Sequence, residues 1–125
     1  MKRTVLGPQG PFSISQGLKV SGQEMVFISG QVAMDDKGAV VAPNDLPAQA
    51  EFVLKSIEKL LGEAGATFRN VVKITAFVTT LENYSAYGAL RKKYFGDHLP
   101  TSSTVQVTGL VVPGCVIEIE AVAIL

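Results

Sequence analysis

The sequence predicts an α+β fold in which two helices cover one face of a single β-sheet. Short runs rich in β-branched residues, which are typical of strands, recur along the chain. Two longer segments carry apolar residues at the three- and four-residue spacing of an amphipathic helix. Glycine and proline separate these segments into the order strand, helix, strand, helix, strand, strand. Two strand–helix pairs contribute their strands to one sheet and place both helices on the same face, so the second face of the sheet has no helix.

The first well-buried strand is predicted at residues 25–31, a short apolar run bounded by turn-forming residues. Residues 18–20 are expected to lead into it as the first half of a hairpin. The strand ends at Ser29 and Gly30, which carry little bulk. A glycine at that point leaves room for another backbone or for a ligand to come close.

The first helix is predicted to begin after Asp45, which suits the N-cap position. Pro47 fits the first turn, where a missing N–H costs nothing, and Gly65 suits the left-handed position that ends a helix. The apolar positions that define the helical period are Ala50, Val53, Leu54, Ile57, Leu60, Leu61 and Ala64.

Residues 71–80 are predicted to form a central strand, because both of their alternating faces are largely apolar. A second helix is expected at about residues 82–95. Gly88 and Arg91 fall on the same stripe of that helix as its aromatic side chains, which is unusual for residues that should point inward. The aromatic residues of the stripe are Tyr84, Tyr87, Tyr94 and Phe95.

Two further strands are predicted at residues 103–108 and 116–125, with a turn at Pro113 and Gly114 between them. Strand alternation assigns one side to an apolar set and the opposite side to a polar set. The apolar set is Val105, Val107, Ile117 and Ile119, and the polar set is Gln106, Glu118 and Glu120. Whichever side the helices leave open is expected to meet a partner.

The chain has 125 residues, which predicts one domain spanning residues 1–125. Its 11 basic residues balance 11 acidic ones, so it lacks the positive field that nucleic-acid binding requires. No stretch approaches the roughly 20 apolar residues of a membrane span, and the N-terminus lacks a signal-peptide core. A cytoplasmic location without membrane or nucleic-acid partners is therefore expected. A mean hydropathy of +0.31 favours apolar surface that sister subunits cover.

The residues alone leave the chemistry open. Glu118 and Glu120 share one side of a strand, so they are either an acid–base pair or, as is commoner, part of a solvated strand face. His98 is interpreted as a lone surface histidine and Cys115 as a small packing residue. No phosphate-binding loop, zinc spacing, serine elbow or dinucleotide fingerprint is present, so neither a metal nor a nucleotide is predicted.

Seven short segments carry a resemblance that spans nearly the whole chain. In order they are Gly10 to Ser13, Val26 to Gln31, Gln49 to Ala50, Val71 to Val78, Tyr94 to Phe95, Ser103 to Val105, and Ile117 to Ala121. Their order and spacing make the chain similar to the YjgF/YER057c/UK114 family, also called the RidA family. The resemblance implies a chorismate-mutase-like α+β sandwich with one mixed sheet and two helices on one face. It also implies a homotrimer whose sheets form a central barrel, with pockets between subunits.

The resemblance further implies a hydrolytic deaminase, which converts a reactive enamine or imine to a carbonyl compound and ammonia without a cofactor. The carbon of such a substrate is already electrophilic, so an oriented water and a proton relay suffice. By the family pattern, Glu118 positions the water. Ser29 and Gly30 line the pocket with backbone groups, and Thr104 offers its main-chain N–H to the small-molecule substrate. A ribonuclease activity also attached to the family has no suitable acid–base pair here.

Three positions depart from the family pattern. Ser102 stands where the imine deaminases carry an arginine that grips the substrate carboxylate. Phe12 replaces a tyrosine, and Gly88 replaces an asparagine. Each change removes a polar group, which predicts an altered substrate range. The alternative is a non-catalytic trimer that binds a small metabolite, or acts as a regulator, through the same cleft.

Arg91 allows two interpretations. In the first, Gly88 vacates space and Arg91 supplies another cation for an anionic substrate, so that Phe12, Gly88, Arg91 and Ser102 join the pocket. In the second, Arg91 pairs with a carboxylate at a subunit interface or extends its guanidinium to solvent. Family members often have a tyrosine at this position.

Overall fold

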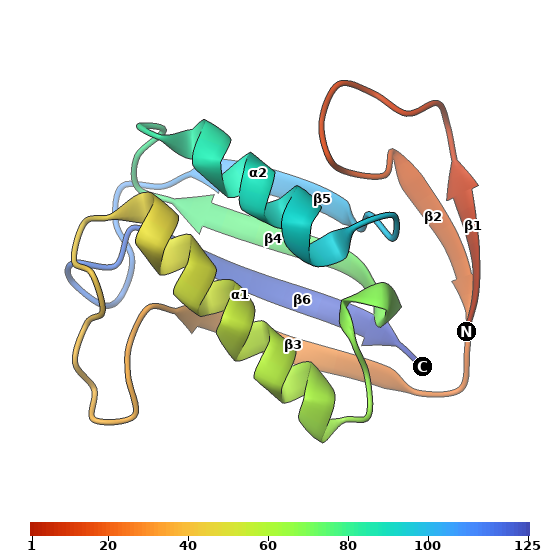
Figure 1. Ribbon diagram of the computed structural model, residues 1–125, viewed down its shortest axis with the longest axis horizontal. Coiled ribbons are helices and arrows are strands. Elements are labelled where there is room, and N and C mark those ends of the chain that lie inside the picture. Colours follow the sequence, from red (N-terminus) through yellow and green to blue (C-terminus); the bar gives the residue numbers. More distant parts are fainter.

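The computed structural model describes residues 1–125 and shows two helices packed on one face of a four-stranded sheet (Figure 1). The sheet has the order β3-β6-β4-β5, in which β4 pairs parallel with β5 and antiparallel with β6. The predicted α+β sandwich with one mixed sheet and a central strand at β4 is therefore confirmed. The strands are β1 (Lys2–Leu6), β2 (Gly17–Ser21), β3 (Met25–Val32), β4 (Val71–Val78), β5 (Thr101–Gln106) and β6 (Ile117–Ile124), and the helices are α1 (Leu46–Glu63), α2 (Tyr84–Phe95) and the short 3-10 helix η1 (Phe68–Asn70).

Helix α1 begins and ends where its sequence predicts. The Asp45 side chain accepts a hydrogen bond from the Ala48 N–H at 3.1 Å, and Pro47 lies in the first turn. Gly65 has a φ of +74°, the left-handed conformation that ends the helix. The helix packs its apolar stripe on the sheet, and the buried members of that stripe are Leu46, Ala50, Val53, Leu54, Ile57 and Leu61.

One buried residue of α1 is polar. Gln49 is fully buried, and its Oε1 atom accepts a hydrogen bond from the Val116 N–H at 2.8 Å. Its Nε2 atom donates to the carbonyls of Val41, Ala42 and Gly114 at 3.2, 3.1 and 2.8 Å. The hydrophobic pattern does not predict this role, because Gln49 lies beside the apolar stripe. These contacts bind the segment before α1 to the segment before β6.

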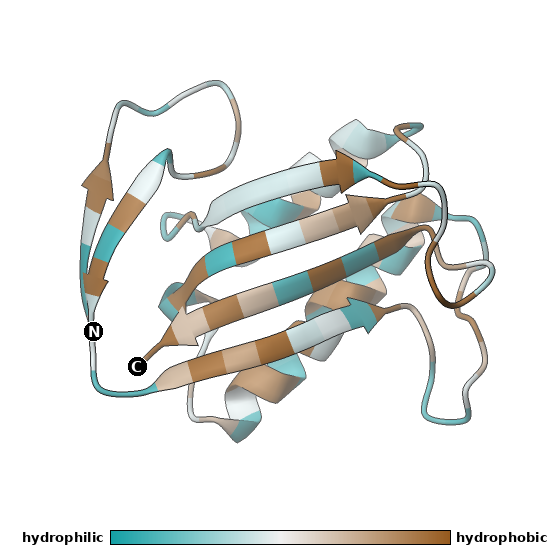
Figure 2. Cartoon of the chain, turned by 180° about the vertical axis from the view of Figure 1, so that it is seen from behind, coloured by the Kyte–Doolittle hydropathy of each residue, from teal (hydrophilic) through white to brown (hydrophobic).

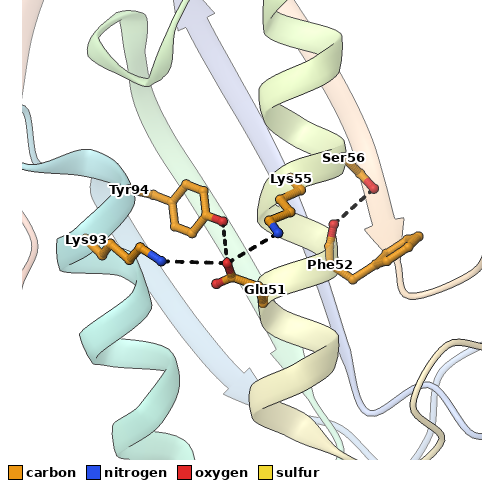
Figure 3. Close-up of polar contacts among 6 residues, drawn as sticks. All are labelled: Glu51, Phe52, Lys55, Ser56, Lys93 and Tyr94. Atoms are coloured by element: carbon orange, nitrogen blue, oxygen red, sulfur yellow. Dashed lines mark hydrogen bonds and ion pairs between the residues drawn. The ribbon is translucent and has the colours of Figure 1, made fainter.

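Helix α2 buries a stripe of three side chains spaced four residues apart, namely Tyr87, Arg91 and Phe95. It lies beside α1, and a polar cluster joins the two helices (Figure 3). The Tyr94 hydroxyl donates to Glu51 Oε1 at 2.8 Å, and the ammonium groups of Lys55 and Lys93 each lie 3.8 Å from that oxygen. Both ion pairs of the chain therefore converge on Glu51.

The predicted hairpin between residues 18–20 and 25–31 is wrong. Strand β2 pairs with β1 in a separate two-stranded sheet, whereas β3 pairs with β6. The connector between β2 and β3 forms hydrogen bonds with the last residue of the chain and does not make a tight turn. The Gln23 N–H donates to the Leu125 carbonyl at 3.0 Å, and the Leu125 N–H donates to the Glu24 carbonyl at 2.9 Å. Strand β1 is exposed and lacks alternation, so its sequence carries little strand signal.

Arg3 holds the β1–β2 hairpin against the sheet. Its guanidinium donates to the carbonyls of Leu99, Arg69 and Val71 at 2.6, 3.0 and 3.3 Å. Burial lowers the pKa of Arg3 below its ordinary value. Ser15 adds a backbone bond from its N–H to the Pro100 carbonyl at 2.9 Å. The hairpin therefore stands beside the sheet without joining it (Figure 1).

The second face of the sheet carries no helix (Figure 2). Large apolar side chains on β3 and β5 are exposed there, with Phe27 at 71%, Met25 at 58% and Val105 at 45%. The prediction that Val105 lies on the side of Ile117 is wrong. Register places Val105 opposite Phe77, which also pairs with Glu118, so Val105 shares the open face with Glu118. Strand β5 begins at Thr101, two residues earlier than predicted.

Candidate functional site

A cavity of about 290 Å³ opens on the helix side of the sheet, between α2, β5 and the loop before β2. Seven side chains line it: Phe12, Ile14, Leu81, Tyr84, Arg91, Ser102 and Thr104. Four of these, Phe12, Arg91, Ser102 and Thr104, are residues that the sequence assigns to the site. Leu81 and Tyr84 also line the cavity. Tyr84 could have been assigned to it from the sequence, because Tyr87 and Arg91 follow it at three and seven residues and therefore lie on the same side of α2.

The Arg91 side chain is buried in the wall of this cavity, with 4% of the residue exposed. Its Nε atom donates to the Ser13 carbonyl at 3.1 Å, and its Cζ atom lies 5.2 Å from the centre of the Tyr87 ring. Neither ion pair of the chain involves Arg91. The guanidinium therefore does not extend to solvent, which excludes that form of the second interpretation. It has no carboxylate partner within this chain, and pairing with a carboxylate of another subunit stays a prediction.

Two polar groups without hydrogen-bond partners lie in the same region as Arg91, one lining its cavity and one on the neighbouring turn of α2. The Oγ atom of Ser102 and the hydroxyl of Tyr87 are both buried and lack a hydrogen-bond partner. Burial raises the pKa of Tyr87 to about 12, because it disfavours the phenolate. Thr104 differs, since its Oγ1 atom accepts a hydrogen bond from the Tyr84 hydroxyl at 3.0 Å. Ser102 and Tyr87 thus retain unused hydrogen-bonding capacity beside a buried cation.

Gly88 lies one turn before Arg91 on α2. A Cβ atom added at Gly88 would meet only one atom within 4 Å, the Nη2 of Arg91 at 3.9 Å. The glycine therefore leaves open space next to the guanidinium, as the first interpretation of Arg91 requires.

Glu118 lies on the other face of the sheet, partly buried on β6. The neighbouring strand β3 is irregular between Ile28 and Gln31, and Gly30 lies within this irregularity. A Cβ atom at Gly30 would come within 2.7 Å of Glu118 Cδ. The space at Gly30 was predicted to admit another backbone or a ligand, but within this chain the Glu118 side chain occupies it.

Ser29 lines a separate depression of about 370 Å³ on the open face. Its polar lining also includes Lys73, Thr75 and Glu120. Within one chain, the structure therefore brings together Phe12, Arg91, Ser102 and Thr104 on the helix side, and Gly30 with Glu118 on the open side. It does not bring Glu118 to Arg91.

No three His, Cys, Asp or Glu side chains gather in a geometry that could hold a metal ion. Cys115 is buried and its Sγ lies 3.9 Å from the Ala33 carbonyl, which confirms it as a packing residue. His98 lies 3.4 Å from an Arg69 guanidinium nitrogen, outside the Arg91 cavity. Neither α1 nor α2 combines the length and the apolar character needed to cross a bilayer.

Comparison with known proteins places the fold and site in a family. The sequence profile described as Endoribonuclease L-PSP matches residues 5–125. The chain is 34% identical to the human 2-iminobutanoate/2-iminopropanoate deaminase over 94% of this chain and 82% of that protein. The Rid-family protein YyfB of Yersinia pestis, of unknown function, superposes with a TM-score of 0.91 at 33% identity, with all of both chains covered. The chain belongs to the RidA (YjgF/YER057c/UK114) family.

A second curated relative, Protein DfrA of Myxococcus xanthus, is 34% identical over 92% of this chain and 86% of its own length. RidA-family membership therefore rests on matches that span nearly the whole chain. It agrees with the chorismate-mutase-like sandwich expected from the resemblance, and the name of the human relative includes imine deamination.

Proposed function

We propose that this RidA-family chain hydrolyses a reactive enamine or imine to a carbonyl compound and ammonia. The observation that carries the proposal is the position of Glu118, a single carboxylate that lies against the backbone at Gly30 on the open face. The human relative is named for the deamination of two imines, 2-iminobutanoate and 2-iminopropanoate. Because the carbon of a C=N bond is already electrophilic, one positioned carboxylate is enough to direct water to it.

In the proposed reaction, Glu118 accepts a hydrogen bond from a water molecule whose oxygen attacks the imine carbon. As the carbon–oxygen bond forms, the π electrons of the C=N bond move to nitrogen, and Glu118 passes one proton from the attacking oxygen to that nitrogen, giving a carbinolamine. Glu118 then transfers the second proton of this oxygen to nitrogen, the carbon–nitrogen bond breaks to release ammonia, and the C=O bond forms. Water and imine thus give carbonyl compound and ammonia, and no cofactor enters the balance.

The proposed assembly is a homotrimer in which neighbouring copies cover the open face. Exposure of Phe27, Met25 and Val105 on that face supports it, since large apolar side chains exposed to water favour association. Because Glu118 and the Arg91 cavity lie on opposite faces of one sheet, a cleft that uses both needs residues from two copies.

The substrate-binding residues we propose come from both faces. On the helix side they are Phe12, Gly88, Arg91, Ser102 and Thr104, and on the open side they are Ser29 and Gly30. The absence of a net charge supports a small-molecule substrate over a nucleic acid, and the proposed setting is the cytoplasm.

The proposal is tested by measuring ammonia release from freshly generated 2-iminobutanoate and 2-iminopropanoate. We expect Glu118→Gln to lower the rate about 100-fold, the usual contribution of a general acid or base. Glu120→Gln is the matched control, because Glu120 is two residues along the same face of β6, and we expect it to stay within about twofold of the native rate. A native rate no faster than that of Glu118→Gln would contradict the enzyme proposal.

The second candidate function is a non-catalytic trimer that binds a small metabolite in the same cleft. One observation favours it: the Arg91 cavity contains no carboxylate of its own chain. A protein that binds 2-oxobutanoate, the hydrolysis product of 2-iminobutanoate, but releases no ammonia from either imine would support this function.

A further inference from the structure

Arg91 is a buried cation without a counter-charge in its own chain. It is 4% exposed, and the chain's two ion pairs lie elsewhere. A buried charge is costly unless it is paired and hydrogen-bonded. We infer that the Arg91 cavity is a carboxylate-binding site, in which the acid lies between the guanidinium of Arg91 and the hydroxyl of Ser102. The inference rests on the proposed function in one respect: the bound carboxylate belongs to the enzyme's substrate only if the chain is the imine hydrolase proposed above.

The hydrogen bonds of Arg91 leave its terminal nitrogens free. Its Nε atom donates to the Ser13 carbonyl at 3.1 Å, and the plane of the group lies near the Tyr87 ring. Neither Nη atom makes a well-formed hydrogen bond within the chain, although the Tyr87 hydroxyl is near enough for Arg91 to oppose the rise in its pKa. Two N–H groups on one planar fork match the two oxygens of a carboxylate, which is the geometry that favours Arg over Lys in such sites.

Ser102 supplies the second element of the site. Its Oγ atom is buried without a partner and lines the same cavity as Arg91. A buried hydroxyl without a partner is uncommon and indicates a missing ligand or water. A carboxylate oxygen in the cavity would accept a hydrogen bond from it. The Ser102 hydroxyl and the Arg91 fork thus provide donors from two elements, β5 and α2.

The rest of the cavity is apolar, which narrows the class of acid. Phe12, Ile14, Leu81 and the Tyr84 ring make up the remaining wall beside Thr104. The only cation in this lining is Arg91, so a second carboxylate would be buried without a partner. A cavity of about 290 Å³ holds roughly ten water molecules at their liquid volume. These features favour a monocarboxylic 2-oxo or 2-imino acid with a branched or aromatic side group.

Binding is tested by calorimetry on the native protein with 4-methyl-2-oxopentanoate as the probe. We expect the uncharged analogue 4-methyl-2-pentanone and the dicarboxylate 2-oxoglutarate to bind at least tenfold more weakly. Arg91→Met keeps an unbranched apolar side chain but removes the guanidinium and its charge, and we expect it to weaken binding of the probe about 10- to 100-fold. We expect Ser102→Ala to weaken it about threefold to tenfold. Lys93→Met is the matched control on the exposed side of α2, and its affinity should equal that of the native protein.

Three results would overturn the inference. These are failure of the native protein to bind the probe, native affinity in Arg91→Met, and equal binding of the uncharged ketone. Dissociation of the native assembly by Arg91→Met would also contradict it, because Arg91 would then pair with a carboxylate of another copy. If Arg91→Met does not fold, native affinity in Ser102→Ala overturns the proposal alone.

The calorimetric test is independent of turnover. A protein that binds the acid through Arg91 but releases no ammonia contradicts the proposed function and supports this inference. A protein that hydrolyses imines with an unchanged KM in Arg91→Met supports the function and contradicts the inference.

Discussion

The Glu118 carboxylate lies so close to Gly30 that a methyl group added at that glycine would come within 2.7 Å of Glu118 Cδ. The two residues are on neighbouring strands, β6 and β3, where the pairing is irregular between Ile28 and Gln31. The backbone at Gly30 therefore forms one wall of the space in which the carboxylate rests.

Gly30→Ala is expected to displace Glu118 without unfolding the protein. The atoms that the new methyl group meets belong to the far end of a flexible side chain, which can rotate away. We expect ammonia release to fall at least tenfold, toward the rate of Glu118→Gln. The control is Gly62→Ala in α1, where an added Cβ meets nothing within 4 Å, and which should stabilise the helix by about 0.5–1 kcal/mol. Full activity in Gly30→Ala would show that the position of Glu118 is not critical.

Replacing Gln49 is expected to lower the stability of the fold, because its buried amide joins the segment before α1 to the segment before β6. Gln49→Leu removes four hydrogen bonds and leaves the Val41 carbonyl and the Val116 N–H without partners. The Ala42 and Gly114 carbonyls keep backbone hydrogen bonds from other N–H groups. We expect the free energy of unfolding in urea to fall by roughly 3 kcal/mol or more. Ser56→Ala, which removes one bond from the Ser56 hydroxyl to the Phe52 carbonyl (Figure 3), should change it by about 0.5 kcal/mol or less.

Ser102→Arg is expected to destabilise the protein through Arg91. The substitution restores the arginine of the family pattern but places two guanidinium groups in one cavity. We expect a loss of roughly 2–4 kcal/mol, because neither charge has a carboxylate partner within the chain. In the Arg91→Met background the same substitution should cost at least about 1 kcal/mol less. Additive costs in this double-mutant cycle would show that the two side chains do not meet.

Stability is expected to fall at alkaline pH because of two tyrosines. Burial raises the pKa of Tyr87 and of Tyr94 to about 12, from an ordinary value of 10.0, and the Glu51 carboxylate adds to the rise at Tyr94. In each case the folded protein favours the neutral phenol. The resulting stabilisation is complete below about pH 10 and is lost as the pH rises from 10 toward 12. Burial also raises the pKa of the Cys115 thiol, which acts in the same direction from its ordinary value of 9.0.

Urea unfolding at pH 8, 10 and 11 checks this prediction. Tyr87→Phe and Tyr94→Phe should each make the decline with pH shallower, and the double variant should be shallower still. A decline of equal steepness in the double variant and the native protein would assign the alkaline loss to other groups.

Helix α1 and strand β4 could be predicted because their signals are local. Asp45, Pro47 and Gly65 mark the ends of α1 within a few residues of its apolar period. The partner of β2 could not be predicted in this way. It depends on contacts between the connector at Gln23 and the C-terminal residue Leu125, which is 102 positions away in the sequence.

The face assigned to Val105 was wrong for a related reason. Alternation shows which residues of a strand share a side, but the side that meets the helices is set by pairing with β4. At the edge of the sheet, β5 has partly exposed side chains on both faces, so apolarity does not decide between them.

Much of the candidate site could be predicted by combining the family pattern with helical spacing, which together placed Ser102 and Arg91 in one region. The family pattern locates Glu118 in the sequence but not relative to Arg91. Only the sheet shows that Glu118 lies on the face opposite the Arg91 cavity. The role of Gln49 stayed hidden because its four partners lie on segments far apart in the sequence.

The open face also bears on how the protein is made. Each newly synthesised chain presents Met25, Phe27 and Val105 to water, and β3 and β5 each leave one edge without a neighbouring strand. Unpaired edges next to apolar side chains are the usual starting points of aggregation. In the proposed trimer other copies cover this face, so association with a folded copy competes in time with aggregation, and the yield of folded protein depends on the rate of synthesis as well as on the stability of the fold.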